Sequence, residues 1–232
     1  MENNQYNLCI EVLSRLDKQG VLKSLVLVGS WCIPFYKEYF SGTDYTTSIT
    51  TRDIDLFVPL PFTAKNKVDV ESLIKDLGFI VEFKGPEGYI RFEHPDLILE
   101  FLVSEKGAGL DKPYKLPQLG ANAQRLRFLN LLTAKLINVK IGNIKINLPH
   151  PAVFALHKLI ISEERINKDK KLKDRDAAVR IIRALLDKGE VEKLRLFFFG
   201  FNLKLRKRII EVLKKAGESD LSGIFDEKNP NY

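Results

Sequence analysis

Apolar residues recur every three or four positions in some segments and form short continuous runs in others, a contrast that predicts helices and strands. Helical spacing predicts helices in the first part of the chain over 5–18, 31–40 and 66–77. Continuous or alternating apolar runs predict strands over 24–28, 53–58, 79–83, 89–93 and 97–103, and a hairpin over 131–139 and 144–148. The segment 104–120 is rich in Gly, Pro and Lys and is expected to be irregular.

The pattern changes at Pro149, beyond which the helical period continues nearly to the end of the chain. Helices are expected over 152–165, 170–188, 191–198 and 203–216, and the last dozen residues are expected to be frayed. Strands and helices mix before this point and helices alone follow it. We therefore predict an α/β or α+β domain over 1–149, followed by a C-terminal helical domain over 150–232.

Composition narrows the class of protein without naming a function. The chain has 232 residues, of which 45% are hydrophobic and 29% charged, which is typical of a soluble globular protein. Its two cysteines, Cys9 and Cys32, are too few for a disulfide framework. The sequence shows no apolar run of membrane-spanning length and no signal-peptide core at its start. We expect a cytoplasmic protein with no membrane partner.

The net charge of +7 is unevenly distributed. Residues 1–116 hold 13 Lys/Arg against 17 Asp/Glu, whereas residues 117–232 hold 24 against 13. A basic second half fits a protein that handles a polyanion, and it equally fits helices with solvated lysine faces. The same two interpretations, RNA contact or solvation, apply to the basic cluster Lys204, Arg206, Lys207 and Arg208.

The candidate chemistry begins with a glycine turn and a pair of carboxylates. The apolar run 25–28 ends in Gly29 and Ser30, and the next strand opens with Asp53 and Asp55. Alternate side chains of a strand point to the same side, so these two carboxylates share a face about 7 Å apart. Such oxygen ligands suit Mg²⁺ or Mn²⁺, which binds one or two carboxylates together with phosphate oxygens. The glycine allows phosphates to approach the backbone closely.

A third carboxylate, Glu100, interrupts an apolar run that should be a buried strand. A buried carboxylate needs a cation or a strong partner, and a metal shared with Asp53 and Asp55 would meet that need. The alternatives are a glutamate that faces water at an edge and one that pairs with a lysine. Asp96 has the same parity and is a second candidate, although it follows Pro95 in a predicted turn.

These residues resemble a known family. Gly29-Ser30, then Thr51-Arg52-Asp53-Ile54-Asp55, then a lone acidic residue on a later strand are similar to the nucleotidyltransferase superfamily typified by DNA polymerase beta. Within it, the closest resemblance is to bacterial stand-alone enzymes, including the toxin-like proteins of abortive-infection systems. The resemblance implies a mixed sheet flanked by helices and transfer of a nucleoside monophosphate from an NTP.

The resemblance also assigns residues. It implies that Asp53, Asp55 and Glu100 are catalytic metal ligands. It implies nucleotide-binding roles for the following residues: Gly29, Ser30, Thr51, Arg52, Lys158, Arg165, Lys173 and Asp174. The acceptor could be tRNA or other RNA, a protein or a small molecule, and an antitoxin-like protein is a possible partner.

Other interpretations of the same residues stay open. Lys158 either reaches a phosphate or extends its stem along an apolar helix, and Asp174 either positions Lys158 or Arg165 or acts as a helix-dipole partner. An Asp-x-Asp pair also occurs in glycosyltransferases that bind nucleotide sugars. A non-catalytic member of the same fold that binds nucleotide or RNA is the further alternative.

Overall fold

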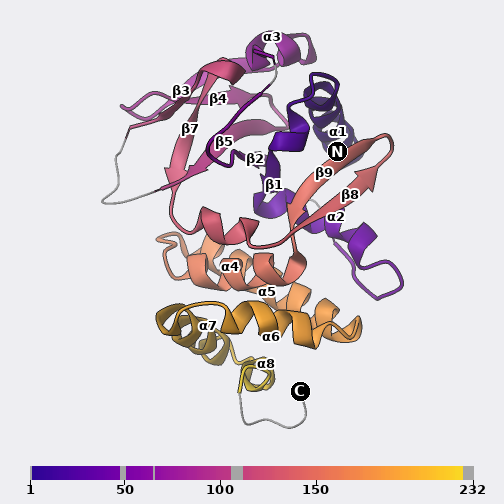
Figure 1. Cartoon of the computed structure of the whole chain (residues 1–232), viewed down its shortest axis with the longest axis vertical. Coiled ribbons are helices and arrows are strands. Elements are labelled where there is room, and N and C mark those ends of the chain that lie inside the picture. The colour runs from indigo at the N-terminus through magenta and orange to yellow at the C-terminus, as the bar shows by residue number, and fades with distance from the viewer. Residues whose placement is uncertain (1, 48–50, 65, 106–111, 227–232) are drawn as a thin grey trace. The chain divides into compact units, whose positions relative to one another are not determined.

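The computed structural model describes residues 2–47, 51–64, 66–105 and 112–226. The chain divides into two compact units. The first comprises Met1–Tyr39 and Thr47–Pro149, and the second comprises Phe40–Thr46 and His150–Tyr232. A mixed sheet with helices fills the first unit and helices fill the second, as the sequence predicts (Figure 1).

Seven strands in the described part of the first unit form one mixed sheet, in which five follow the order β1-β2-β5-β4-β3. The strands are β1 (Val26–Val28), β2 (Asp53–Phe57), β3 (Ile80–Lys84), β4 (Tyr89–Glu93), β5 (Ile98–Ser104), β6 (Tyr114–Leu116) and β7 (Ala121–Leu126). The β2–β5 and β5–β7 pairs are parallel, and the other pairs are antiparallel. Strand β2 pairs along one edge of β5. Strand β4, which pairs with the start of β5, and β7, which pairs with its end, therefore both lie along the other edge.

Pairing between β2 and β5 separates an apolar face of the sheet from a polar one. Asp55 is the partner of Glu100 in the parallel register, and Asp53 is the partner of Ile98. On the opposite face Ile54, Leu56, Leu99 and Phe101 are at most 1% exposed. The alternation of β2 therefore buries its aliphatic side chains and leaves both aspartates half-buried on the polar face.

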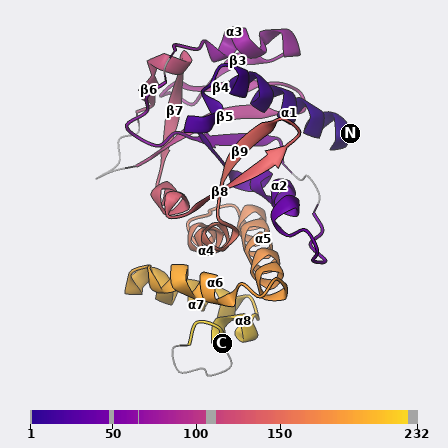
Figure 2. The ribbon, with the colours of Figure 1, turned by 45° about the vertical axis from the view of Figure 1, so that its right-hand side comes forward.

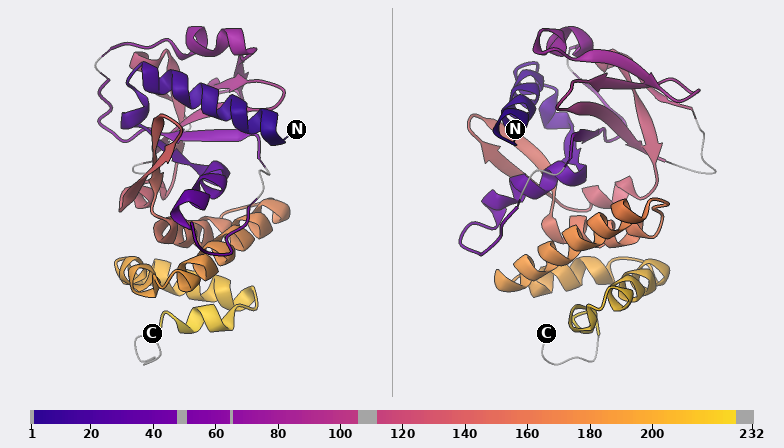
Figure 3. Two further views of the ribbon diagram at one scale, coloured as in Figure 1. Left: turned by 90° about the vertical axis from the view of Figure 1, so that its right-hand side faces the viewer. Right: turned by 180° about the vertical axis from the view of Figure 1, so that it is seen from behind.

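The described residues of the first unit form the α-helices α1 (Glu2–Lys18), α2 (Cys32–Tyr39) and α3 (Val70–Ile74). Short 3₁₀ turns cover Leu22–Ser24, Gly29–Trp31, Lys75–Leu77, Pro117–Leu119 and Leu129–Thr133. Helix α1 lies across the sheet (Figure 3) and contributes Cys9, Val12, Leu13 and Leu16 to the core. Arg15 connects α1 to the α3 region by donating to the Leu73 carbonyl at 2.8 Å and pairing with Asp76.

A separate hairpin of β8 (Leu136–Ile141) and β9 (Ile144–Pro149) packs beside β1 (Figure 2). The Asn147 side-chain amide donates to the carbonyls of Lys23 and Leu25, both at 2.9 Å. The Tyr36 hydroxyl of α2 donates to the Pro149 carbonyl at 2.8 Å. These bonds fasten the end of the hairpin to the segments on both sides of the glycine turn.

The second unit contains α4 (Pro151–Ser162), α5 (Lys168–Asp187), α6 (Val191–Phe199), α7 (Leu203–Lys215) and α8 (Ser219–Gly223). Helix α4 is buried along nearly its whole length and contacts α5, α6 and α7. Side chains of His150, Asn167 and Asn202 cap the first turns of α4, α5 and α7. Among the described helices of the chain, none has the length and apolar content that crossing a membrane requires.

Several segments differ from the sequence-based prediction. The strand β6, Tyr114–Leu116, lies within 104–120, which was expected to be irregular. The β7 strand, with the sequence Ala-Asn-Ala-Gln-Arg-Leu, was not predicted because these residues have low strand propensity; parallel pairing with β5 imposes the strand. Residues 129–133 form a 3₁₀ turn, and the hairpin strand begins only at Leu136. The last dozen residues were expected to be frayed, yet α8 extends into them and Leu221, Ile224 and Phe225 are buried. The rest of this segment, 227–232, lies outside the described residues.

The turn after β1 depends on glycine. Gly29 has a φ of +71°, which side-chain-bearing residues rarely adopt. A Cβ atom placed on it would lie 2.2 Å from Oδ2 of Asp55. This contact follows from the sheet register, because Val28 is the partner of Asp55 and Gly29 comes next. The backbone at Gly29 therefore touches the second carboxylate of the Asp-x-Asp pair.

Buried charges connect α4 and α5 in the second unit. Lys158 Nζ donates to Asp174 Oδ1 at 2.6 Å, and Arg165 Nε donates to Asp174 Oδ2 at 2.9 Å. The side chains of Lys158 and Asp174 are 5% and 8% exposed, whereas that of Arg165 is 41% exposed. Burial would raise the pKa of the Asp174 carboxyl, but the charges and hydrogen bonds of Lys158 and Arg165 outweigh burial and lower it.

The close contact at Gly29 predicts an effect on stability that backbone strain alone would not give. Gly142→Ala provides the matched control, because Gly142 also has a positive φ but nothing lies within 4 Å of its added Cβ. We expect Gly142→Ala to lower the free energy of unfolding by about 1 kcal/mol and Gly29→Ala by at least about 2 kcal/mol. Urea denaturation measures both changes, and equal losses would contradict a close contact at Gly29. In an Asp55→Ala background the extra loss should largely disappear.

The Asp174 cluster predicts a pH-dependent loss of stability. Because the folded pKa of Asp174 lies below its unfolded value, the stabilisation is complete above the unfolded pKa of about 4 and is lost as pH falls through the folded pKa. Asp174→Asn should lower the free energy of unfolding at pH 7 by about 3–5 kcal/mol, because Lys158 loses its buried counter-charge. The difference from wild type should shrink below about pH 4.

Asp176 supplies the control for this experiment, since it is exposed on the same helix. Asp176→Asn should change the free energy of unfolding by less than about 0.5 kcal/mol. Urea titrations at pH 7 and pH 3 give the comparison. A destabilisation by Asp174→Asn that is the same at both values would refute the electrostatic origin.

Candidate active site

The polar face of the sheet gathers the first group of predicted site residues. Asp53 and Asp55 project from the same side of β2, and Glu100 is the register partner of Asp55 on β5. Gly29 touches Asp55 from the end of β1, and Ser30 follows it in the 3₁₀ turn Gly29–Trp31. The structure thus brings a glycine turn and two carboxylate-bearing strands together, although they are far apart in sequence.

Glu100 has a different environment from the two aspartates. Its side chain is 16% exposed, and Oε1 lies 3.2 Å from Arg91 Nε and 3.9 Å from Lys84 Nζ. Arg91 is on β4 and Lys84 on β3, the two strands that extend the sheet beyond β5. A buried carboxylate was expected to need a cation, and in this structure a guanidinium and an ammonium supply positive charge.

The described side chains form no complete metal-binding cluster by themselves. In the described ranges, no group of three or more His, Cys, Asp or Glu side chains is assembled closely enough to hold a metal ion. Asp53 and Asp55 present carboxylate oxygens of the kind that Mg²⁺ takes in addition to phosphates. Asp96, the alternative third ligand, is 56% exposed in the turn before β5, next to His94.

Thr51 and Arg52 lie immediately before β2. The Thr51 hydroxyl accepts a hydrogen bond from the Asp53 amide at 3.2 Å and so fixes the start of the strand. Arg52 donates from Nη2 to the His94 carbonyl at 2.8 Å, and the same nitrogen lies 3.9 Å from Glu93 Oε1. In this structure Thr51 and Arg52 therefore orient the strand that carries the aspartates.

The remaining predicted residues lie in the second unit. Lys158, Arg165 and Asp174 form the buried cluster between α4 and α5, and Lys173 is exposed on α5. Both suggested partners of Asp174, Lys158 and Arg165, contact it. The Lys158 ammonium also lies 5.5 Å from the centre of the Phe154 ring.

His157 borders this cluster and carries no charge at neutral pH. Burial lowers the pKa of His157 to about 3, with a further contribution from the charge of Lys158. Its Nε2 atom has no hydrogen-bond partner among the described residues. Arg165 differs from His157 and Lys158, because its side chain is 41% exposed while its hydrogen bond to Asp174 fixes its position.

Sequence reasoning did not identify Arg91 and Lys84. Both lie on strands that were predicted, but their position opposite Glu100 depends on how β4 joins β5. The only available signal was the unpaired charge of Glu100 itself, which indicated that some cation must be near. The sequence offered several cations and no register to choose between them.

Comparisons with known proteins identify a family and similar folds. A family model described as "Nucleotidyltransferase" matches residues 7–195. No curated protein sequence matches the chain significantly. An antigenic nucleotidyltransferase-like protein from Paracoccidioides brasiliensis is similar in structure, with a TM-score of 0.52 and 15% identity over 94% of this chain and 91% of that one.

Two structures of the antibiotic-resistance factor ANT(2'')-Ia are also similar. The solution structure has a TM-score of 0.47 and 17% identity, covering 86% of this chain and 94% of that one. The complex with adenylyl-2''-tobramycin has a TM-score of 0.47 and 16% identity, covering 84% and 94%. Because the family model spans far more than half of the sequence, this chain belongs to the nucleotidyltransferase family.

Proposed function

We propose that the chain transfers a nucleoside monophosphate from an NTP to an acceptor hydroxyl, with Asp53, Asp55 and Glu100 as the catalytic carboxylates. The observation that carries this proposal is the register that sets Asp55 beside Glu100 and against the Gly29 turn. Family membership supports nucleotidyl transfer over the glycosyltransferase interpretation of the Asp-x-Asp pair. Residues 1–149 then provide the catalytic domain and 150–232 the helical domain.

Asp53 and Asp55 are the residues that fit a divalent cation. They supply hard oxygen donors from one side of β2, and one or two carboxylates suffice for Mg²⁺ when phosphates complete its coordination. Bound Mg²⁺ or Mn²⁺ supplies positive charge that neutralises the triphosphate oxygens. Glu100 shares its negative charge with Arg91 and Lys84, so we assign it a supporting place beside Asp55.

The chain's own groups have definite tasks in this reaction. The Gly29 backbone leaves space for a phosphate, and the Ser30 hydroxyl can donate a hydrogen bond to it. The acceptor oxygen bonds to the α-phosphorus, the bond from that phosphorus to the β-phosphate oxygen breaks, and pyrophosphate leaves. The proton of the acceptor hydroxyl passes to a carboxylate oxygen on this face of the sheet.

In the second unit we assign nucleotide contact to Arg165 and Lys173, with Lys158 and Asp174 as the residues that hold Arg165. Lys158 Nζ already donates to Asp174 at 2.6 Å and is buried, which argues against it as the first phosphate ligand. Arg165 keeps 41% of its side chain exposed while Asp174 fixes its orientation. A planar guanidinium held in this way is well suited to a phosphate.

The resemblance to toxin-like enzymes makes tRNA the first acceptor to test. Other RNA, a protein and a small molecule are the remaining classes, and an antitoxin-like protein is the partner that such a role would require. The basic second half of the chain, with 24 Lys/Arg against 13 Asp/Glu, supports a polyanionic acceptor. Incubation with each radiolabelled NTP, Mg²⁺ and total tRNA separates these classes by where the label appears.

Substitution of the aspartates tests the catalytic assignment. Asp53→Asn and Asp55→Asn should each reduce transfer at least about 1,000-fold, because about 4 kcal/mol of transition-state stabilisation depends on a neutralised phosphate charge. Glu100→Gln should reduce it less, since Arg91 and Lys84 already offset its charge. Release of labelled pyrophosphate in the presence of Mg²⁺ measures all three.

Glu87→Gln is the matched control, because Glu87 is an exposed carboxylate in the turn between β3 and β4. It should retain wild-type transfer, and thermal unfolding should show that every variant remains folded. The proposal fails if wild-type protein transfers no label to RNA, protein or small-molecule acceptors and Asp53→Asn leaves NTP affinity in Mg²⁺ unchanged.

A further inference from the structure

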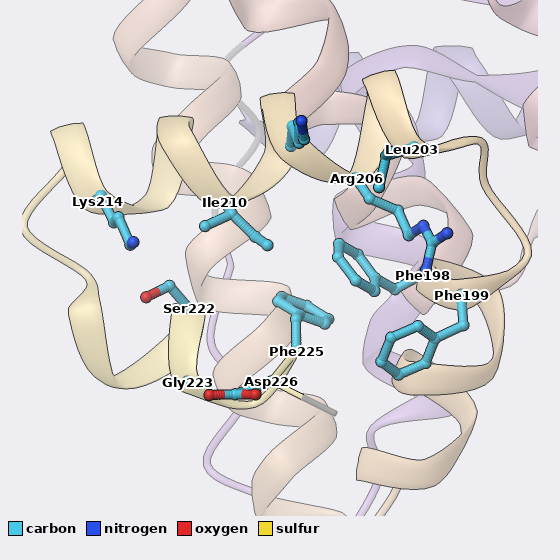
Figure 4. Close-up of a pocket in the computed structure, with 11 residues that line it drawn as sticks. Phe198, Phe199, Leu203, Arg206, Ile210, Lys214, Ser222, Gly223, Phe225 and Asp226 are labelled. Carbon is cyan, nitrogen blue, oxygen red and sulfur yellow. The ribbon is translucent and has the colours of Figure 1, made fainter. Parts of the chain in front are cut away.

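A groove of about 440 Å³ lies within the second unit, built from α6, α7 and the α8 region (Figure 4). Its lining combines aromatic and aliphatic side chains with cations, and the proposed chemistry uses none of these residues. Leu203, Arg206, Lys207, Ile210 and Lys214 contribute from α7. Their spacing of three and four residues places them along one side of that helix.

The floor of the groove is apolar and rigidly held. Phe198 and Phe225 stack with ring centroids 4.2 Å apart, and they are 1% and 3% exposed. Arg195 donates to the Ile224 carbonyl and, at 3.4 Å, to the Asp226 carbonyl, which fastens α6 to the segment after α8. Arg183 connects α5 to the same region through Glu218 and Asp220. The groove is therefore preformed, which reduces the entropic cost of binding.

The cations lie along one side of the groove, on α7. The Arg206 guanidinium lies 5.8 Å from the centre of the Phe199 ring at one end, and Lys214 lies at the other end near Ser222 (Figure 4). Lys207 is exposed between them along the helix. Asp226 is the acidic residue in the lining, so positive charge predominates. From Arg206 to Lys214 the helix rises by about 12 Å.

We propose that this groove binds single-stranded nucleic acid, with a base against the partly exposed side chains of Phe199 and Ile210 and successive phosphates along Arg206, Lys207 and Lys214. A cationic wall of about 12 Å is too long for one carboxylate or one phosphate and fits a chain of phosphodiesters. Phe199 and Ile210 are partly exposed and can take the flat face of a base, which stacks on hydrophobic and guanidinium surfaces regardless of sequence.

Binding in the groove does not depend on the proposed transfer, because every lining residue lies outside the predicted catalytic set. Variants of Asp53 or Asp55 should therefore bind an oligonucleotide as tightly as wild type does. The two proposals can therefore fail separately. If the protein transfers no nucleotide but binds RNA in the groove, the binding proposal stands. If it transfers nucleotide but binds no RNA in the groove, the transfer proposal stands.

Fluorescence anisotropy with a labelled 12-nucleotide RNA tests the groove in the full-length protein. Lys207→Ala with Lys214→Ala should weaken binding at least about tenfold and reduce the slope of log K against log salt by about 1.4, corresponding to two lost phosphate contacts. An oligonucleotide without bases should bind the wild type at least about tenfold more weakly than the normal RNA, because stacking is lost. The affinities of a DNA oligonucleotide and of a free mononucleotide, compared with that of the RNA, show which of these phosphate-bearing ligands the groove prefers.

Lys204→Ala with Lys215→Ala is the matched control. It removes the same charge from exposed positions of the same helix outside the groove lining. It should change affinity less than about threefold, and circular dichroism should show both double variants folded. Equal loss in the two double variants, equal binding of the base-free strand, equal competition by polyglutamate, or no binding by wild type below 1 mM protein would each overturn the proposal.

Discussion

The parallel pairing of β2 with β5 is the constraint on which the candidate active site depends. It sets Asp55 level with Glu100 and, through the antiparallel pairing of β1, places Gly29 against Asp55. A shift of one residue in this register would turn both aspartates into the apolar core and Ile54 towards solvent. The complete burial of Ile54, Leu56 and Leu99 therefore does more than stabilise the sheet, because it also fixes which way the carboxylates face.

Two cations of the chain lie close to the partly buried Glu100 carboxylate. Arg91 and Lys84 approach the same carboxylate oxygen from β4 and β3. A carboxylate that is already paired binds a further cation less strongly, because part of its charge is neutralised. The strands beyond β5 therefore set the charge around the third carboxylate, Glu100.

Sequence patterns predicted most of the elements, because the strands and helices that bury large aliphatic residues have clear periods. The strand β7 was missed because its inward residues Ala121 and Ala123 are small and its remaining residues favour other structures. The carboxylates were predicted because charge inside an apolar run is conspicuous. Arg91 was not, since an alternating strand on a half-exposed face gives no reason to single out one cation, and the pairing that selects it is set by tertiary structure.

The assignment of Phe40–Thr46 to the second unit has a consequence for dissecting the protein. The chain leaves the first unit after Tyr39, returns at Thr47 and leaves again at Pro149, so no single cut separates the two units. Phe40 is 1% exposed and its ring lies 4.7 Å from that of Tyr45. A fragment ending at Pro149 would carry this segment without the helices it belongs to, and a fragment beginning at His150 would lack it. A fragment ending at Pro149 would therefore expose the Phe40 ring, which the intact polypeptide buries.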